Sequence, residues 1–307
     1  MPRILLHTLP SFVPFHTLHN FTASQKHCEE NKKLTKMKFH PDSLPNLTGK
    51  VYVVTGGTSG MYDTCLFLPS SLFLIPSNSP LNRGYNTVAR LAQHGANVYL
   101  GARNLAKGTQ AIKEIKTLYP QANLTLLEMD HLSLSSVVSA ATLLLSRESA
   151  IHGLINNAGI MATPLEMTKD GYEAQFQTNH LAHWVLVSYL LPLMLDTSKS
   201  LPPGSVRIVN LSSVGHWSAP KGGINFSDTS LAGQANMARY GQSKLANVLH
   251  IKTLHKLYGP DSPSAKAGKG EIWAAAVHPG CRLLDELPFL HSKRVFYGLR
   301  PGGISDA

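Results

Sequence analysis

The chain has 307 residues, of which 43% are hydrophobic and 15% are charged, so it can bury a sizeable core and is not disordered throughout. Its 3 cysteines are too few for a disulfide framework and lack the spacing of zinc ligands. The net charge of +10 is spread thinly along the chain, so nucleic acid is not expected as a partner. We expect no transmembrane span, because the most apolar run, residues 181–195, contains His183 and Pro192.

Residues 1–49 carry no regular hydrophobic period, so we predict a disordered N-terminal extension there. Acidic residues are absent before Glu29, and Arg3 precedes a short apolar run, a pattern weakly like a mitochondrial presequence. Because Arg3 is the single arginine of this stretch, we expect a cytoplasmic location and keep a mitochondrial one as the alternative.

From Lys50 onward, short apolar runs alternate with stretches of helical period. The predicted strands are Val51–Val54, Asn97–Leu100, Leu124–Leu127, Gly153–Asn156, Val206–Leu211 and Ile272–Val277. The predicted helices are Tyr85–His94, Ala106–Leu118, Leu134–Ser146, Tyr172–Leu195 and Met237–Tyr258. This alternation predicts an α/β fold with one doubly wound parallel sheet of the Rossmann type, in a single domain over residues 50–281. Ligands of such sheets bind beyond the carboxyl ends of the strands.

A glycine turn follows the first predicted strand. Thr55, Gly56 and Gly60 come directly after it and Gly84 opens the next helix, so removal of residues 62–83 would leave the run T-G-x-x-x-G-x-G. Glycines let the backbone approach a pyrophosphate, and a helix N-terminus offers free N–H groups to it. Taken alone, this pattern is explained equally well by a tight connection between a strand and a helix.

Two further turns follow predicted strands. An acid after the second strand would bind the ribose hydroxyls of NAD, whereas a cation suits the 2′-phosphate of NADP. Arg103 therefore favours NADP over NAD, with an ordinary surface arginine as the alternative. Asn157, Ala158 and Gly159 follow the fourth strand, where small and amide residues let the chain bend beneath a cofactor. A plain Asx turn is the alternative there.

Tyr240 and Lys244 are four residues apart, on one face of a predicted helix. A tyrosine is a poor base at neutral pH, and a neighbouring ammonium group favours its phenolate form. Ser213, after the fifth strand, has a hydroxyl that can donate to a substrate carbonyl, and Asn179 lies in the long helix after the fourth strand. A solvated helix face is the usual explanation of Y-x-x-x-K alone.

In their order and spacing, these residues resemble the short-chain dehydrogenase/reductase family over residues 50–280. The run YGQSKLAN from Tyr240 to Asn247, and the step from Ser213 to Tyr240, resemble its retinol-dehydrogenase-like branch with its fungal members. The positions that carry the resemblance are Thr55, Gly56, Gly60, Gly84, Asp130, Asn156, Asn157, Ala158, Gly159, Asn179, Ser213, Tyr240, Lys244, Pro279 and Gly280.

The resemblance implies an NADP-dependent oxidoreductase that interconverts a carbonyl and an alcohol on a small, lipophilic molecule. Tyr240 would be the general acid/base, Lys244 would assist it and hold the nicotinamide ribose, and Ser213 would polarise the carbonyl. Asn179 would hold a proton-relay water and Asp130 would contact the adenine. The other expected cofactor-binding residues are Thr55, Gly56, Gly60, Gly84, Arg103, Asn157, Ala158, Gly159, Pro279 and Gly280. The resemblance also implies a homo-oligomer, and no metal is expected.

Two stretches depart from the family pattern. Residues 61–83 form an insertion where one apolar residue normally separates two glycines, and residues 282–307 form an atypical, shortened end with no convincing closing strand. Loop closure costs little free energy, so the fold is expected to tolerate the insertion, whereas an active site needs exact placement. A catalytically impaired or silent Rossmann protein is therefore the alternative function.

Overall fold

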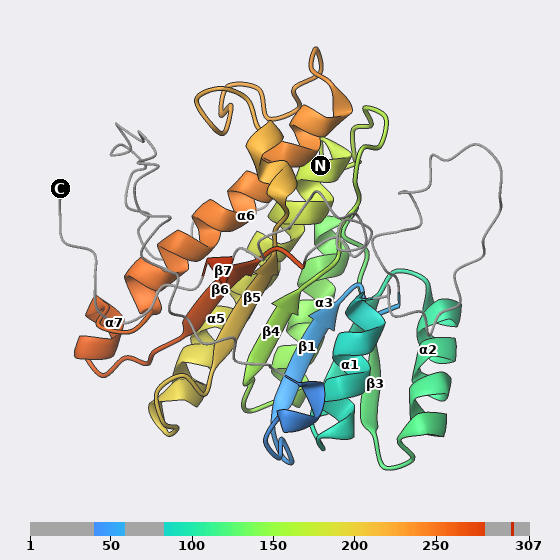
Figure 1. Ribbon diagram of the computed structural model, residues 1–307, viewed down its shortest axis with the longest axis vertical. Coiled ribbons are helices and arrows are strands. Elements are labelled where there is room, and N and C mark those ends of the chain that lie inside the picture. Colours follow the sequence, from blue (N-terminus) through green and yellow to red (C-terminus); the bar gives the residue numbers. More distant parts are fainter. Residues whose placement is uncertain (1–39, 59–82, 280–295, 298–307) are drawn as a thin grey trace, which may run out of the picture. The chain divides into compact units, whose positions relative to one another are not determined.

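A sheet of parallel strands forms the centre of the fold (Figure 1). The computed structural model describes residues 40–58, 83–279 and 296–297. Within these residues the sheet has seven strands in the order β3-β2-β1-β4-β5-β6-β7. The strands are β1 (Val51–Thr55), β2 (Asn97–Ala102), β3 (Asn123–Glu128), β4 (Gly153–Asn156), β5 (Arg207–Leu211), β6 (Trp273–Val277) and β7 (Phe296–Tyr297). The predicted doubly wound parallel sheet is confirmed.

The end of the sheet differs from the prediction. Phe296 and Tyr297 pair antiparallel with Val277 and Ala276, so a short strand does follow β6. Two residues carry too little periodicity to be found from the sequence. Several predictions fall on other parts of the chain: Gly60, Gly280, most of the proposed extension 1–49, the insertion 61–83 apart from Arg83, and most of the tail 282–307 lie outside the described residues.

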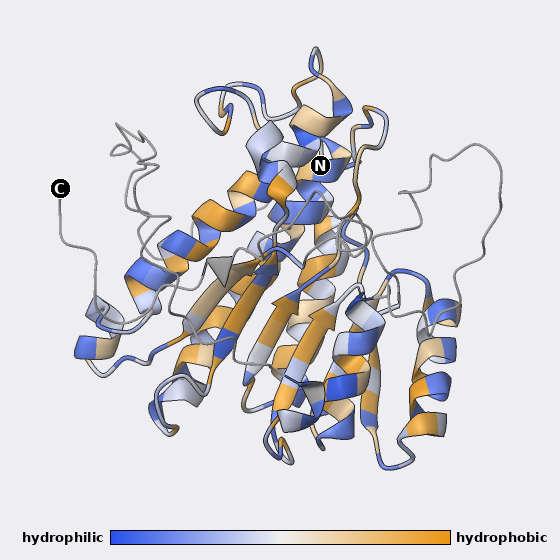
Figure 2. Ribbon diagram, viewed as in Figure 1, coloured by the Kyte–Doolittle hydropathy of each residue, from blue (hydrophilic) through white to orange (hydrophobic). Residues whose placement is uncertain are grey.

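Helices cover both faces of the sheet. The helices of this unit are α1 (Arg83–Gln93), α2 (Leu105–Leu118), α3 (Leu134–Arg147), α4 (Ala174–Phe176), η5 (Gln177–Leu181), α5 (Ala182–Lys199), η6 (Val214–Ser218), α6 (Asn236–Tyr258) and α7 (Pro263–Lys266). A separate helical turn, η4, comprises Pro41–Ser43. Val54 belongs to the core with α1 and α2, whereas Val53 belongs to the core with α3, α5 and α6. Since both faces are covered, the strands are apolar along their length, as Figure 2 shows.

The long helix predicted over Tyr172–Leu195 is divided. Glu173 caps the short α4 by accepting from Phe176 N, and a π-helical turn, η5, precedes α5. The Asn179 carbonyl, inside this turn, accepts from the side chain of Asn247 on α6 at 2.9 Å. A π turn is typical of functional sites, and here it turns Asn179 toward α6.

The segment Ala174–Lys199 is long and apolar enough to cross a membrane by length and composition. In this fold Leu186, Leu190 and Met194 are fully buried in the core shared with α3 and α6. The segment therefore occupies the place of a core helix.

Gly84 allows α1 to begin against the turn after β1. A Cβ at Gly84 would lie 2.1 Å from the Gly56 oxygen and 2.7 Å from Asn157 Nδ2. We expect Gly84→Ala to lower the free energy of unfolding by roughly 2–3 kcal/mol, because backbone atoms would have to move apart. Gly233→Ala is the matched control, since a Cβ there meets nothing within 4 Å. Urea unfolding measures both, and equal stability of the two variants would contradict this packing.

Candidate active site

The turn after β1 brings three segments together. Gly56 has a φ of +63°, and a Cβ on it would lie 2.9 Å from Ala158 Cα. Asn157 Nδ2 donates to the Thr55 and Gly56 carbonyls at 2.9 and 3.1 Å. These contacts fix the end of β1 against the loop that follows β4.

Thr55 is fully buried and braces this turn from below. Its Oγ1 accepts from the backbone N–H groups of Asn157 and Ala158 at 2.9 and 3.0 Å, and lies 2.8 Å from His183 Nε2. The second ring nitrogen of His183 lies 3.1 Å from the Asn179 carbonyl oxygen. Thr55 therefore supports the glycine turn rather than lining the pocket above it.

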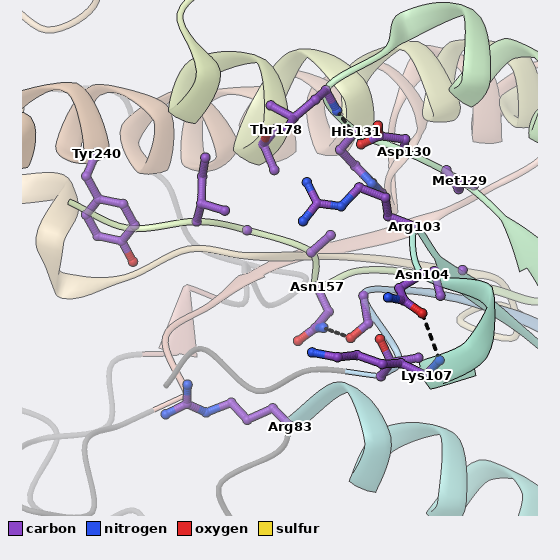
Figure 3. Close-up of a pocket in the computed structure, with 18 of the residues that line it drawn as sticks. Arg83, Arg103, Asn104, Lys107, Met129, Asp130, His131, Asn157, Thr178 and Tyr240 are labelled. Carbon is purple, nitrogen blue, oxygen red and sulfur yellow. Dashed lines mark hydrogen bonds between the residues drawn. The ribbon is translucent and has the colours of Figure 1, made fainter. Parts of the chain in front are cut away.

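A pocket opens at the carboxyl ends of β1 to β4 (Figure 3). The predicted residues that line it are Gly56, Arg103, Asp130, Asn157, Ala158, Gly159, Tyr240 and Lys244. It is also lined by residues that were not predicted from the sequence: Thr58, Arg83, Lys107, Met129, His131, Ile160 and Thr178. Asn104, which follows Arg103 in the turn after the second predicted strand, lines it as well. The predicted residues Thr55, Gly84, Asn179, Ser213 and Pro279 lie outside the lining.

One end of the pocket is basic. Arg103 follows β2, and Lys107 lies one turn along in the first turn of α2. Asn104 caps α2 by accepting from Lys107 N at 2.9 Å. Two exposed cations therefore border the same opening, and Asp130 lines the pocket near Arg103. Such an end suits a phosphate group.

Tyr240 and Lys244 occupy the other end, on α6, and each is 1% exposed. Lys244 Nζ lies 5.7 Å from the centre of the Tyr240 ring and donates to the Leu211 carbonyl at 2.9 Å. Burial, followed by the charge of Arg83, lowers the pKa of Lys244 from 10.5 to about 8. The expected pairing of phenol and ammonium on one helix face is therefore present.

Ser213 lies close to the edge of the Tyr240 ring. A Cβ at Gly215 would lie 2.7 Å from Tyr240 Cε1 and 3.3 Å from Ser213 Oγ. Ser213 Oγ also accepts from Gly215 N at 3.1 Å, which starts η6. The glycine thus allows the serine hydroxyl and the tyrosine ring to converge from β5 and α6.

The side chain of Asn179 is fully buried and shapes the loop after β4. Its Oδ1 accepts from Ile160 N at 2.8 Å, and its Nδ2 donates to the Ile160 carbonyl and to Ser243 Oγ, both at 2.9 Å. These bonds join the loop to α6. Asn179 therefore holds the floor of the pocket through its amide.

Histidine rings lie at and next to the site, where His131 lines the pocket. The rings of His131 and His183 meet at 4.7 Å between centres, and His180 Nδ1 lies 3.2 Å from Asn247 Oδ1. Burial lowers the pKa of both His131 and His180 to about 4. Burial therefore favours neutral rings at both positions, and the His180 ring lies within hydrogen-bond distance of Asn247.

Several known proteins resemble this chain in sequence. A family profile described as short chain dehydrogenase matches residues 84–281, more than half of the chain. The short-chain dehydrogenase/reductase drtF of Aspergillus calidoustus is 48% identical over 242 residues, which cover 78% of this chain and 69% of that protein. Retinol dehydrogenase 12 of Mus musculus is 35% identical over 242 residues, which cover 78% of this chain and 63% of that protein.

Solved structures share the fold. An uncharacterized protein from Mycobacterium paratuberculosis has a TM-score of 0.59 and 31% identity, covering 79% of this chain and 72% of that one. A metagenomic short-chain oxidoreductase, solved in complex with NADP, has a TM-score of 0.53 and 21% identity, covering 77% and 85%.

This chain spans about two thirds of the length of the curated relatives it matches. The predicted likeness to fungal and retinol-dehydrogenase-like proteins agrees with these relatives. On the family profile, the relatives and the fold, the chain belongs to the short-chain dehydrogenase/reductase family.

Proposed function

We propose that the chain is an NADP-dependent oxidoreductase that interconverts a carbonyl and an alcohol on a small, lipophilic molecule. The observation that carries this proposal is the pairing of Tyr240 and Lys244 at one end of a pocket, with Ser213 close to the edge of the tyrosine ring and exposed cations at the other end. A proton donor thus faces the place where the reactive end of a bound dinucleotide would lie.

The pocket wall would fit a dinucleotide because small residues, Gly56, Ala158 and Gly159, form part of it. A Cβ at Gly159 would lie 3.0 Å from Asn179 Oδ1 and 3.3 Å from Lys244 Nζ, so glycine lets the loop after β4 pack closely against both side chains. Gly56, Asn157 and Ala158 would line the phosphates, and Lys244 would hold the nicotinamide ribose. When bound, the nicotinamide supplies or accepts the hydride.

The protein's own groups would handle the proton. In the direction of reduction, Tyr240 would donate its phenolic proton to the carbonyl oxygen, and Ser213 would donate a hydrogen bond to the same oxygen. The Lys244 ammonium, 5.7 Å from the ring centre, would stabilise the phenolate that remains. In the direction of oxidation the phenolate would take the alcohol proton back.

Apolar side chains near these groups support a lipophilic substrate. Val214 and Trp217 on η6, directly after Ser213, are 42% and 73% exposed, and Met237 at the start of α6 is 37% exposed. Exposed apolar surface beside a polar reaction centre favours a substrate with an apolar body.

Titration with NADPH and NADH, followed by a screen of aldehydes, ketones and retinoid-like alcohols, tests the proposal. We expect NADPH to bind both this chain and a form lacking residues 62–83, and at least one carbonyl compound to be reduced. Binding by the shortened form alone would favour the catalytically silent alternative.

The choice of cofactor is tested at the basic end. Arg103→Ala is expected to weaken NADPH binding roughly 10-fold and to leave NADH binding unchanged, because a charge-assisted bond to the 2′-phosphate is lost. Lys113→Ala, an exposed lysine of α2 outside the pocket lining, is the control. An equal loss for both cofactors would contradict this role of Arg103.

A further inference from the structure

Arg83 adds a further cation to the pocket, beyond Arg103, Lys107 and Lys244. It begins α1 and lines the pocket together with Tyr240 and Lys244. Figure 3 shows its side chain extending from α1 to the side of the pocket where the Tyr240 hydroxyl lies. In the sequence, Arg83 is the last residue of the predicted insertion 61–83, whereas in the structure it is the first residue of α1.

The charge of Arg83 acts at a different place from that of Arg103. The Arg83 guanidinium adds to the effect of burial in lowering the pKa of Lys244, and it also acts on His278 after β6. Arg103 acts instead on His131, at the basic end of the pocket. The two arginine charges therefore act at different ends of the same pocket.

The first residues of α1, Arg83 and Gly84, lie next to the glycine turn after β1. A Cβ at the following residue, Gly84, would lie 2.1 Å from the Gly56 oxygen, so Arg83 begins beside Gly56. Gly56 and Thr58 line the pocket there. Among the described residues that line the pocket, Asp130 is the single acid, and Figure 3 places it near Arg103.

The covalent order of a dinucleotide decides what reaches this position. If the 2′-phosphate lies at Arg103 and the nicotinamide lies beside Tyr240, the diphosphate must pass between them, along Gly56 and the start of α1. The inference rests on the proposed function in this respect. We propose that Arg83 binds the diphosphate of the cofactor through its guanidinium, so that a side chain bordering the insertion supplements the backbone of the glycine turn.

Three ligands separate this contact from the others: NADPH, 2′-phospho-ADP-ribose, which keeps the diphosphate, and adenosine 2′-monophosphate, which lacks it. Calorimetric titration of the full chain compares the wild type with Arg83→Gln and with Arg90→Gln, an arginine of α1 outside the pocket lining. We expect Arg83→Gln to lower the affinity for NADPH and for 2′-phospho-ADP-ribose by roughly 10- to 100-fold. The affinity for adenosine 2′-monophosphate should be unchanged. Arg90→Gln should change none of the three affinities.

Unchanged affinity of Arg83→Gln for 2′-phospho-ADP-ribose would overturn the inference while leaving the proposed function in place. An equal loss for adenosine 2′-monophosphate would also overturn it, because the effect would then not depend on the diphosphate. A rise in KM confined to acidic substrates, with cofactor affinity unchanged, would assign Arg83 to the substrate instead. Failure of the wild type to bind any of the three ligands would contradict the proposed function itself, and the inference with it.

Discussion

Tyr240→Phe is expected to lower turnover by about a thousandfold and to leave NADPH affinity near that of the wild type. The substitution removes the phenolic proton and keeps the ring, which packs against the Gly215 segment, and Tyr240 is 1% exposed. Steady-state turnover and a binding titration on the same preparation measure the two effects separately.

Tyr258→Phe is the matched control, because Tyr258 lies at the end of the same helix and outside the pocket lining. It should keep full turnover. Turnover of Tyr240→Phe close to that of the wild type would remove Tyr240 from the role of acid and base.

Lys244→Met is expected to lower turnover by about 100-fold or more while raising the free energy of unfolding by about 1–2 kcal/mol. Lys244 is buried, and its pKa falls from 10.5 in water to about 8, so its charge destabilises the folded state. Methionine fills a similar volume without that charge. The Leu211 carbonyl keeps a donor, Asn247 Nδ2 at 3.2 Å, after the ammonium is lost.

The stability difference between the wild type and Lys244→Met should depend on pH. Below pH 8 both states hold the Lys244 proton and the destabilisation is fully present, whereas between about pH 8 and 10.5 the folded state releases the proton first and regains stability. The stability advantage of Lys244→Met should therefore shrink over this window. Urea unfolding of both proteins at pH 7 and pH 10 measures it, and a variant less stable than the wild type at pH 7 would contradict the argument.

The strands and the main site residues could be predicted because they follow strong local rules. A buried parallel strand is a continuous apolar run, so β4 begins and ends at the predicted residues, Gly153 and Asn156. Residues at the carboxyl ends of such strands, including Gly56 and Arg103, line the pocket as expected.

Residues whose role depends on contacts between distant segments could not be found in this way. His183 braces Thr55, and Asn179 bonds to Ile160, through partners that sequence spacing does not reveal. Lys107 was missed although a signal existed, since the first turn of the helix that follows β2 lies at the same strand end as Arg103. Arg83 was missed because it borders an insertion without a usable period.

The central claim is that Tyr240, Lys244 and Ser213 act on a substrate beside a bound nicotinamide. A crystal structure of the full chain with NADP tests it most directly. The account predicts the nicotinamide C4 within about 4 Å of a substrate position reached by the Tyr240 hydroxyl, with the 2′-phosphate at Arg103. A nicotinamide ring directed away from Tyr240, or a cofactor bound in the reverse orientation, would contradict it.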